Sequence, residues 1–292
     1  MRNKIDAIVS KLLTLPPASR HITAFSGGVD SSLTLQLVSI AFPETSLAVI
    51  GVSAALPAEQ LAIARDVARV VDVELLEVAT DEGSKVDYVA NKGQSCFHCK
   101  TSLYSALSSV LHTSTALHTT ADPVTLYNGT NKDDRADPTR IGLLAAANFD
   151  VVSPLSSLTK PEVRAMSKLL GLPNHDFAAS PCLRSRLAFG VEATTEHLAK
   201  IERAEAAVKE ALLLPVEKNL RVRLLAGGKV AVELDYDGGE GGYSGWVEEQ
   251  RGILRDEGVE REFLEELAFT SMQVRRFKSG GEAKEIHIDE LR

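Results

Sequence analysis

The stretch AFSGGVDSSL, residues 24–33, combines residue types that bind phosphate. Its two glycines allow a positive φ and let the backbone come close to an anion. Its serines add hydroxyl groups, and the amides of a helix that begins there favour negative charge. Asp30 would repel phosphate unless a cation lay between them, so the turn implies Mg²⁺. The candidate phosphate-binding residues are Ser26, Gly27, Gly28, Asp30, Ser31 and Ser32.

The turn lacks the Gly-Lys-Ser/Thr sequence of kinases and GTPases. A glycine turn that only caps a helix is the simpler alternative, but its position directly after an apolar strand favours phosphate binding. The string SGGVDS resembles the signature of the ATP pyrophosphatase (PP-loop) superfamily, which includes NAD, GMP and asparagine synthetases. This resemblance implies that the turn holds the pyrophosphate part of ATP and that AMP is passed to a substrate oxygen.

The chain has three cysteines, two of them close together. Cys96 and Cys99 have C-x-x-C spacing, which occurs in zinc half-sites, in redox pairs and by chance. With Cys182 as the third ligand, three thiolates would hold three irons of a [4Fe–4S] cluster and leave one iron open. Alternatively, Cys182 acts alone, and the neighbouring arginines favour its thiolate. Three unrelated buried cysteines are the remaining alternative.

Charged residues in the second half of the chain are candidates for holding a substrate. Guanidinium groups suit carboxylate and phosphate, because they donate two parallel hydrogen bonds. The candidate substrate-binding residues are Arg184, Arg186, Arg221 and Arg223. Glu205 and Glu233 are candidate ligands of a cation near the substrate, although most glutamates on helices and strands are solvated.

The elements that must position these residues alternate between strands and helices in the first half of the chain. Strands are predicted at 21–25, 46–54, 73–80 and 124–131, and helices at 4–14, 32–41, 57–71, 137–149 and 159–173. This alternation indicates an α/β fold with a parallel sheet covered by helices. The fourth strand ends in a polar turn, where parallel sheets bind ligands. The residues of this turn are Gly129, Thr130 and Asn131, followed by Asp133 and Asp134.

The pattern changes near residue 178. A long helix at 194–214 precedes a hairpin at 220–236, a Gly-rich loop, an acidic helix and a final strand at 270–280. We therefore predict a PP-loop domain at 1–178 and a smaller α+β domain at 179–292. The segment 237–263 receives no role.

Several motifs in sequence order, CFHCKTSLY, NGTNKDD, VVSPL, PCLRSRLAFG and KIERAEAAV, together resemble the LarE family. LarE proteins are ATP-dependent sacrificial sulfur transferases that help make the nickel-pincer nucleotide cofactor of lactate racemase. The resemblance implies ATP and Mg²⁺ as cofactors and pyridinium-3,5-biscarboxylic acid mononucleotide as the substrate. Its carboxylates would be adenylated and then converted to thiocarboxylates.

The resemblance also implies that the domain at 179–292 carries the sulfur-transfer, substrate and oligomerisation functions, and it implies roles for the cysteines. Cys182 matches the sulfur-donating cysteine, which in single-cysteine members attacks the acyl adenylate and ends as dehydroalanine. Members with three cysteines carry the sulfur on a [4Fe–4S] cluster, and Cys96, Cys99 and Cys182 match that form. The alternatives are an amidating ligase of the NAD synthetase type, a tRNA-thiolating enzyme and a nucleotide-binding regulatory protein.

Bulk properties narrow the partners. The net charge of −8 argues against a nucleic-acid partner, which usually needs a basic face. No apolar run is long enough for a membrane span, and the amphipathic first residues lack a secretory cleavage pattern. The few cysteines favour a reducing compartment, so we expect a cytoplasmic protein with a small nucleotide-like carboxylate as its substrate. The LarE resemblance implies a homo-oligomer, a hexamer in that family.

Overall fold

The computed structural model describes residues 1–113, 123–136, 149–238 and 242–278. Its contacts divide the chain into two compact units. Unit 1 comprises residues 1–82 and 96–176, and unit 2 comprises residues 83–95 and 177–292. The predicted helix at 137–149 lies almost entirely outside the described residues. No helix within the described ranges is long and apolar enough to cross a membrane.

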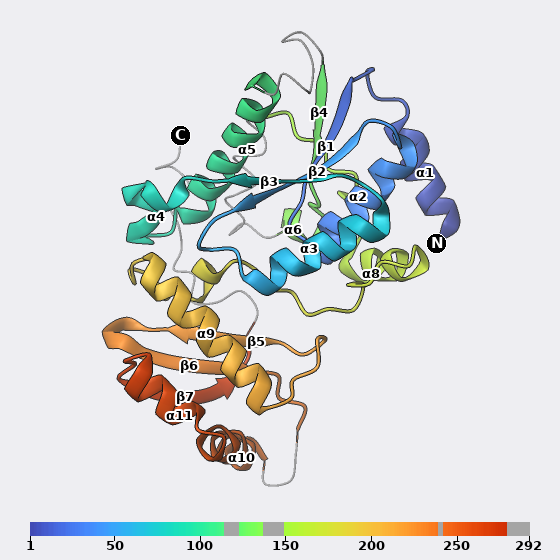
Figure 1. Ribbon diagram of the computed structural model, residues 1–292. Helices are drawn as coiled ribbons and strands as arrows, with labels where there is room; N and C mark the ends of the chain where they lie inside the picture. The colour runs from blue at the N-terminus through green and yellow to red at the C-terminus, as the bar shows by residue number, and fades with distance from the viewer. Residues whose placement is uncertain (114–122, 137–148, 239–241, 279–292) are drawn as a thin grey trace. The chain divides into compact units, whose positions relative to one another are not determined.

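Unit 1 contains a four-stranded sheet in the order β3-β2-β1-β4 (Figure 1). All of its strand pairs are parallel, as predicted. The strands are β1 (Arg20–Ala24), β2 (Ser46–Val52), β3 (Leu75–Ala79) and β4 (Val124–Tyr127). The helices associated with this unit are α1 (Arg2–Leu12), α2 (Val29–Ala41), α3 (Ala58–Val71), α5 (Ser95–Thr113), α6 (Lys132–Ala136) and α8 (Lys160–Leu169), and a 3₁₀ turn, η1 (Glu82–Ser84), follows β3.

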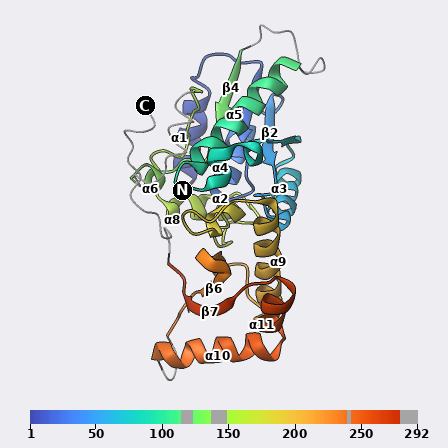
Figure 2. The ribbon, with the colours of Figure 1, turned by 90° about the vertical axis from the view of Figure 1, so that its left-hand side faces the viewer.

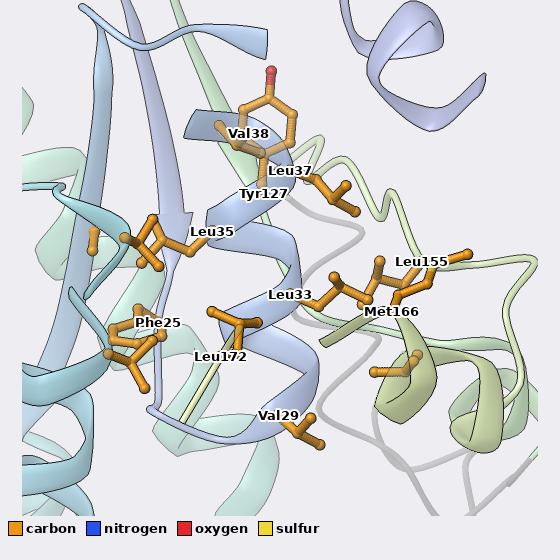
Figure 3. Packing of buried hydrophobic residues seen from close by; sticks show 14 of the residues in the cluster. Phe25, Val29, Leu33, Leu35, Leu37, Val38, Tyr127, Leu155, Met166 and Leu172 are labelled. Carbon is orange, nitrogen blue, oxygen red and sulfur yellow. The ribbon is translucent and has the colours of Figure 1, made fainter. Parts of the chain in front are cut away.

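The sheet of unit 1 is buried on both faces. Along β2, Ala48 and Ile50 join one apolar cluster, whereas Leu47 and Val49 join the other. The alternation arises because successive strand residues point to opposite faces. The larger cluster includes Leu33, Leu35 and Leu37 of α2 (Figure 3), together with side chains of α1, α3 and α8, and the smaller one contains side chains of α5. Two covered faces are typical of doubly wound α/β proteins.

Unit 2 contains a three-stranded sheet in the order β5-β6-β7. The hairpin β5–β6 is antiparallel, as predicted, and β7 pairs in parallel with β6. The strands are β5 (Leu220–Leu224), β6 (Lys229–Leu234) and β7 (Ser271–Arg276). The helical segments are α4 (Val86–Ala90), η2 (Leu183–Arg186), α9 (Thr195–Ala211), η3 (Ala226–Gly228), α10 (Gly242–Asp256), α11 (Val259–Arg261) and the π-helical turn η4 (Glu262–Glu266).

The core of unit 2 lies between α9 and the sheet. Ile201, Ala204 and Val208 recur at helical spacing on α9 and are fully buried. The helix packs on β5, and α10 packs beside β7 and α11 (Figure 2). The α/β fold class predicted from the sequence is confirmed: a PP-loop-like parallel sheet accompanies a smaller mixed sheet.

Segment 83–95 belongs to unit 2 because Asn91 ties it to a later loop. The Asn91 Nδ2 donates to the carbonyl oxygens of Ala188 and Val191, at 3.0 Å each. The amide of Ala193 donates to the Val89 carbonyl at 2.8 Å. These hydrogen bonds attach segment 83–95 to the second unit, whereas the sequence prediction placed it in the first domain.

Candidate active site

The candidate phosphate-binding turn at residues 26–32, called the phosphate turn below, lies at the topological switch point of the sheet in unit 1. The sheet order places β4 directly beside β1, whereas the chain leaves β1 for β2 on the other side. The loops after β1 and β4 therefore both begin at the carboxyl ends of two neighbouring parallel strands. Open α/β sheets bind ligands at this position.

Gly27 is required by the shape of the turn. Its φ is +70°, and a Cβ there would lie 2.7 Å from the Gln60 Nε2 and 3.0 Å from the Ala64 Cα. The Gln60 Nε2 donates to the Ser26 carbonyl at 2.8 Å, so α3 holds the turn from behind. A side chain at position 27 would break this packing and strain the backbone.

Gly129 brings the loop after β4 against the start of α2. A Cβ on Gly129 would lie 2.6 Å from the Ser31 amide nitrogen and 2.7 Å from the Asp30 carbonyl carbon. The Thr130 amide donates to the Asn128 Oδ1 at 3.1 Å, which shapes the same loop. The structure thus brings the predicted residues of the two loops together.

The hydroxyl groups of the turn mostly serve its own backbone. The Ser31 and Ser32 hydroxyls each donate to the Gly28 carbonyl at 3.0 Å, and both residues are buried. The Ser26 Oγ is 3.1 Å from the Ser31 Oγ. The N-cap of α2 is Gly28, and among the described residues no side chain caps the amides at the start of this helix. Uncapped amides at a helix N-terminus are suited to an anion.

Asp30 forms an ion pair that the sequence did not reveal. Lys160, the first residue of α8, contacts its carboxylate, and the Asn131 Nδ2 donates to Asp30 Oδ1 at 3.0 Å. The Lys160 amide donates to Asp133 Oδ2 at 2.8 Å. A lysine from α8, a helix far along the chain, therefore lies beside the turn. Thr159 and Glu162 have capping-box spacing in the sequence and mark where α8 begins, but nothing in the sequence placed that helix beside Asp30.

Asn131 organises the polar turn after β4. Its Oδ1 accepts hydrogen bonds from the amides of Asp133 and Asp134, at 2.9 and 3.0 Å. With 2% of its surface exposed, Asn131 uses both ends of its amide: one caps α6 and the other orients Asp30.

Asn174 is a second residue that sequence reasoning missed. It is almost fully buried, and its Nδ2 donates to the Gly27 carbonyl at 2.7 Å and to the Ser32 Oγ at 2.9 Å. No pattern marks Asn174, because it follows α8 in a loop far along the chain.

The three cysteines are divided between the two units. Cys96 and Cys99 lie in the first two turns of α5 in unit 1, where Cys96 is exposed and Cys99 is half-buried. Cys182 belongs to unit 2, is half-buried and precedes the 3₁₀ turn η2. The described residues contain no group of three or more histidine, cysteine, aspartate or glutamate side chains that could hold a metal ion. The iron–sulfur cluster stays a prediction.

The predicted substrate arginines have partners within unit 2. Arg186 pairs with Glu205, Nε to Oε1, at 2.9 Å, and Arg223 pairs with Glu233, Nε to Oε2, at 2.7 Å. The Arg184 Nη1 donates to the Asn91 Oδ1 at 3.0 Å. Arg221, Arg186 and both glutamates are buried. Burial and the nearby Arg186 charge lower the pKa of Arg221 to about 10.

Comparisons with known proteins place the chain in a family. It is 36% identical to the uncharacterized protein slr1717 of Synechocystis over 195 residues, which is 64% of this chain and 67% of that protein. It is 26% identical over 200 residues to pyridinium-3,5-bisthiocarboxylic acid mononucleotide synthase of Lactiplantibacillus plantarum, covering 65% of this chain and 67% of the synthase. No protein-family model matches.

The fold defines an α/β protein with a PP-loop-like parallel sheet in one unit and a smaller mixed sheet in the other. The chain belongs to the same family as the slr1717 protein, and its distant similarity to the synthase supports a LarE-like family.

Proposed function

We propose that this protein is an ATP-dependent sulfur transferase that adenylates a substrate carboxylate, releases pyrophosphate and then replaces oxygen by sulfur. The main support is the phosphate turn at the sheet's switch point, with uncapped amides at the start of α2 and Lys160 beside Asp30. The similarity to a synthase of a bisthiocarboxylic acid supports sulfur as the incoming atom.

In this proposal unit 1 binds ATP. The amides of Val29 and Asp30 face the pyrophosphate part, and Lys160 adds a positive charge. Asp30 fits a magnesium site, because its side chain is 25% exposed and Mg²⁺ usually takes one or two carboxylates together with substrate phosphates. The ion would neutralise charge that builds up on the phosphates.

Sulfur is supplied from unit 2 through Cys182. The Cys182 thiolate attacks the carbonyl carbon of the acyl adenylate, and the bond to AMP breaks. Loss of the Cys182 Cα proton then cleaves the Cβ–S bond, leaving dehydroalanine and a thiocarboxylate. The protein loses one sulfur and two hydrogens, the composition of H₂S. The alternative source, a cluster held by Cys96, Cys99 and Cys182, would leave the mass of the polypeptide unchanged.

The proposed substrate is pyridinium-3,5-biscarboxylic acid mononucleotide, the dicarboxylic counterpart of the product that the synthase's name gives. Thiocarboxylates on this compound are the ligands that a nickel-pincer cofactor needs. We also propose that the chain acts in the cytoplasm as a homo-oligomer, which sedimentation would test.

The test uses anaerobically purified protein with ATP, Mg²⁺ and this substrate. We expect AMP and pyrophosphate in equal amounts and a thiocarboxylate by mass spectrometry. A polypeptide that loses the mass of H₂S identifies Cys182 as the source, whereas an iron-containing protein of unchanged mass identifies the cluster. Failure to release AMP and pyrophosphate would refute the proposal.

Cys182→Ala separates this function from amidation. The variant should still form the adenylate, detected as exchange of labelled pyrophosphate into ATP, but should make no thiocarboxylate. An amidating ligase would retain full product formation with ammonia, because it has no use for the thiol.

A further inference from the structure

The loop that carries Cys182 is held by arginine side chains that donate hydrogen bonds to its backbone carbonyl groups. Arg221 donates to the Ala179 carbonyl, and Arg186 donates to the carbonyls of Pro181 and Cys182, the latter at 3.2 Å. The Arg223 Nη1 donates to the Ser185 carbonyl at 2.9 Å. Three guanidinium groups thus bind four carbonyls of one short loop.

Two buried carboxylates fix two of these arginines, Arg186 and Arg223, in turn. Glu205 on α9 accepts from the Nε and Nη2 of Arg186, at 2.9 and 3.1 Å, and from the Val222 amide at 3.0 Å. Glu233 on β6 accepts from the Nε of Arg223 at 2.7 Å and from the Nε of Arg275 at 2.9 Å. The arginine orientations are therefore set by α9 and by the central strand.

The burial of Arg186 argues against the substrate-binding role predicted for it. The residue is 1% exposed, and its Nε, Nη1 and Nη2 all have partners within unit 2. A substrate carboxylate could reach this guanidinium group only by displacing Glu205 or the loop. Buried ion pairs rarely add stability over apolar packing, and in some proteins they instead specify a single conformation.

We propose that Arg186 and Glu205 are positioning residues for Cys182, with Arg221, Arg223 and Glu233 completing the frame. They hold the Cys182 backbone in one conformation, so that its thiol meets the acyl adenylate without a search through loop conformations. This inference rests on the proposed function for its chemical purpose. The positioning itself is testable without substrate.

The test compares Arg186→Lys with Arg203→Lys. A lysine keeps the charge at position 186 but cannot bind Glu205 in two places and two loop carbonyls together. Arg203 lies on the same helix as Glu205, its side chain is 52% exposed, and within the described ranges it forms ion pairs with Glu262 and Glu266. Both variants are followed by alkylation of Cys182 with iodoacetamide, resolved by peptide mass spectrometry, and by hydrogen exchange of residues 179–186.

We expect Arg186→Lys to raise both rates by roughly tenfold or more, because at least two hydrogen bonds that close the loop are lost. Arg203→Lys should change them less than about twofold, since exposed ion pairs contribute little. If Arg186→Lys does not fold, Glu205→Gln replaces it, with a smaller increase expected. Unchanged rates in a folded Arg186 or Glu205 variant would overturn the inference.

A second readout separates this inference from the proposed function. Arg186→Lys should keep pyrophosphate exchange into ATP but lose thiocarboxylate formation, because adenylation takes place in unit 1. If the wild-type protein shows no ATP-dependent activity, the proposed function fails while the alkylation and exchange rates still decide the positioning role. If the rates rise but sulfur transfer is undiminished, the frame is structural only and the positioning role is refuted.

Discussion

At the scale of single residues, two glycines shape the candidate site, one in the phosphate turn and one in the loop after β4. Gly27 adopts a positive φ against α3, and Gly129 lets the loop after β4 touch the backbone of Ser31. The sequence predicted both positions from their residue types, since glycine after a strand is informative in itself. It could not predict Lys160 or Asn174, because their roles depend on tertiary contacts between segments far apart in the chain.

Gly27→Ala should destabilise unit 1 and abolish adenylation. A non-glycine residue at positive φ costs on the order of 1–3 kcal/mol, and the new methyl group would also displace Gln60. Urea unfolding and pyrophosphate exchange into ATP measure the two effects. Gly252→Ala is the matched control: Gly252 lies within α10 with open space around it, so alanine should stabilise the protein by up to about 1 kcal/mol. Wild-type exchange activity in Gly27→Ala would contradict the assignment of the turn.

Asn174→Ala should raise the KM for ATP and lower the free energy of unfolding by about 1–3 kcal/mol. The variant leaves the buried Gly27 carbonyl without the Asn174 donor, and unsatisfied buried groups carry that cost. Ser167→Ala is the control, because the Ser167 hydroxyl is buried without a hydrogen-bond partner among the described residues. Its removal should be neutral or slightly stabilising and should leave the KM unchanged. Equal effects of the two substitutions would show that Asn174 does not shape the turn.

At the scale of elements, the start of α8 connects local sequence to the site. Thr159 and Glu162 form the capping box that the sequence predicted, with the Thr159 amide donating to Glu162 Oε2 at 2.9 Å. Hydrogen bonds from Lys4 and from Thr159 lower the pKa of Glu162 to about 2. The box fixes the first turn of the helix, and Lys160 in that turn reaches Asp30.

Thr159→Ala should therefore cost about 1 kcal/mol of stability and also weaken ATP binding. Thr194→Ala is a matched control in unit 2, where the Thr194 hydroxyl accepts from the His197 amide at 3.1 Å at the start of α9. It should cost a similar amount of stability while leaving the KM for ATP unchanged. Urea unfolding and pyrophosphate exchange at varied ATP concentration compare the two. An equal rise of the KM for ATP in both variants would show that the α8 cap has no specific effect on ATP binding.

Elements with strong periodicity or clear caps were predictable, and others were not. The strands of the parallel sheet and the helices α3, α8 and α9 lie close to their predicted ranges. The sequence did not indicate α5, because Ser95–Thr113 is rich in serine, threonine and cysteine, which have modest helix propensity. That helix is stabilised by burying Leu103, Tyr104 and Leu107 against the sheet, a tertiary effect.

At the scale of the whole molecule, the division into units follows contacts that no local pattern reveals. Asn91 adopts a left-handed conformation, with φ +51°, and attaches segment 83–95 to a loop about a hundred residues later. The chain therefore crosses between the units more than once. A boundary inferred from composition is a single point, so it cannot describe this arrangement. The roles assigned to the two domains stay predictions.

The stability of the whole protein should also depend on a buried pair within unit 1. The His21 Nδ1 lies 2.8 Å from the Tyr127 hydroxyl, and both side chains are buried. Burial lowers the pKa of His21 and raises that of Tyr127 to about 12. The folded state thus favours both neutral forms. The contribution of His21 is present above pH 6.5 and is lost as the pH falls through its lowered folded pKa. The contribution of Tyr127 is present below pH 10 and is lost as the pH rises through about 12.

Urea unfolding of the wild type, His21→Gln and Tyr127→Phe across this pH range tests the pair. The wild type should lose stability relative to His21→Gln below pH 6.5, by at most about 1.4 kcal/mol for each pH unit, because unfolding takes up one proton there. It should lose stability relative to Tyr127→Phe between pH 10 and 12, where unfolding releases the phenolic proton. Each variant removes one titrating group. The difference in the free energy of unfolding between the wild type and Tyr127→Phe should therefore not change with pH below pH 6.5. Parallel pH profiles for all three proteins would show that neither group titrates differently in the folded and unfolded states.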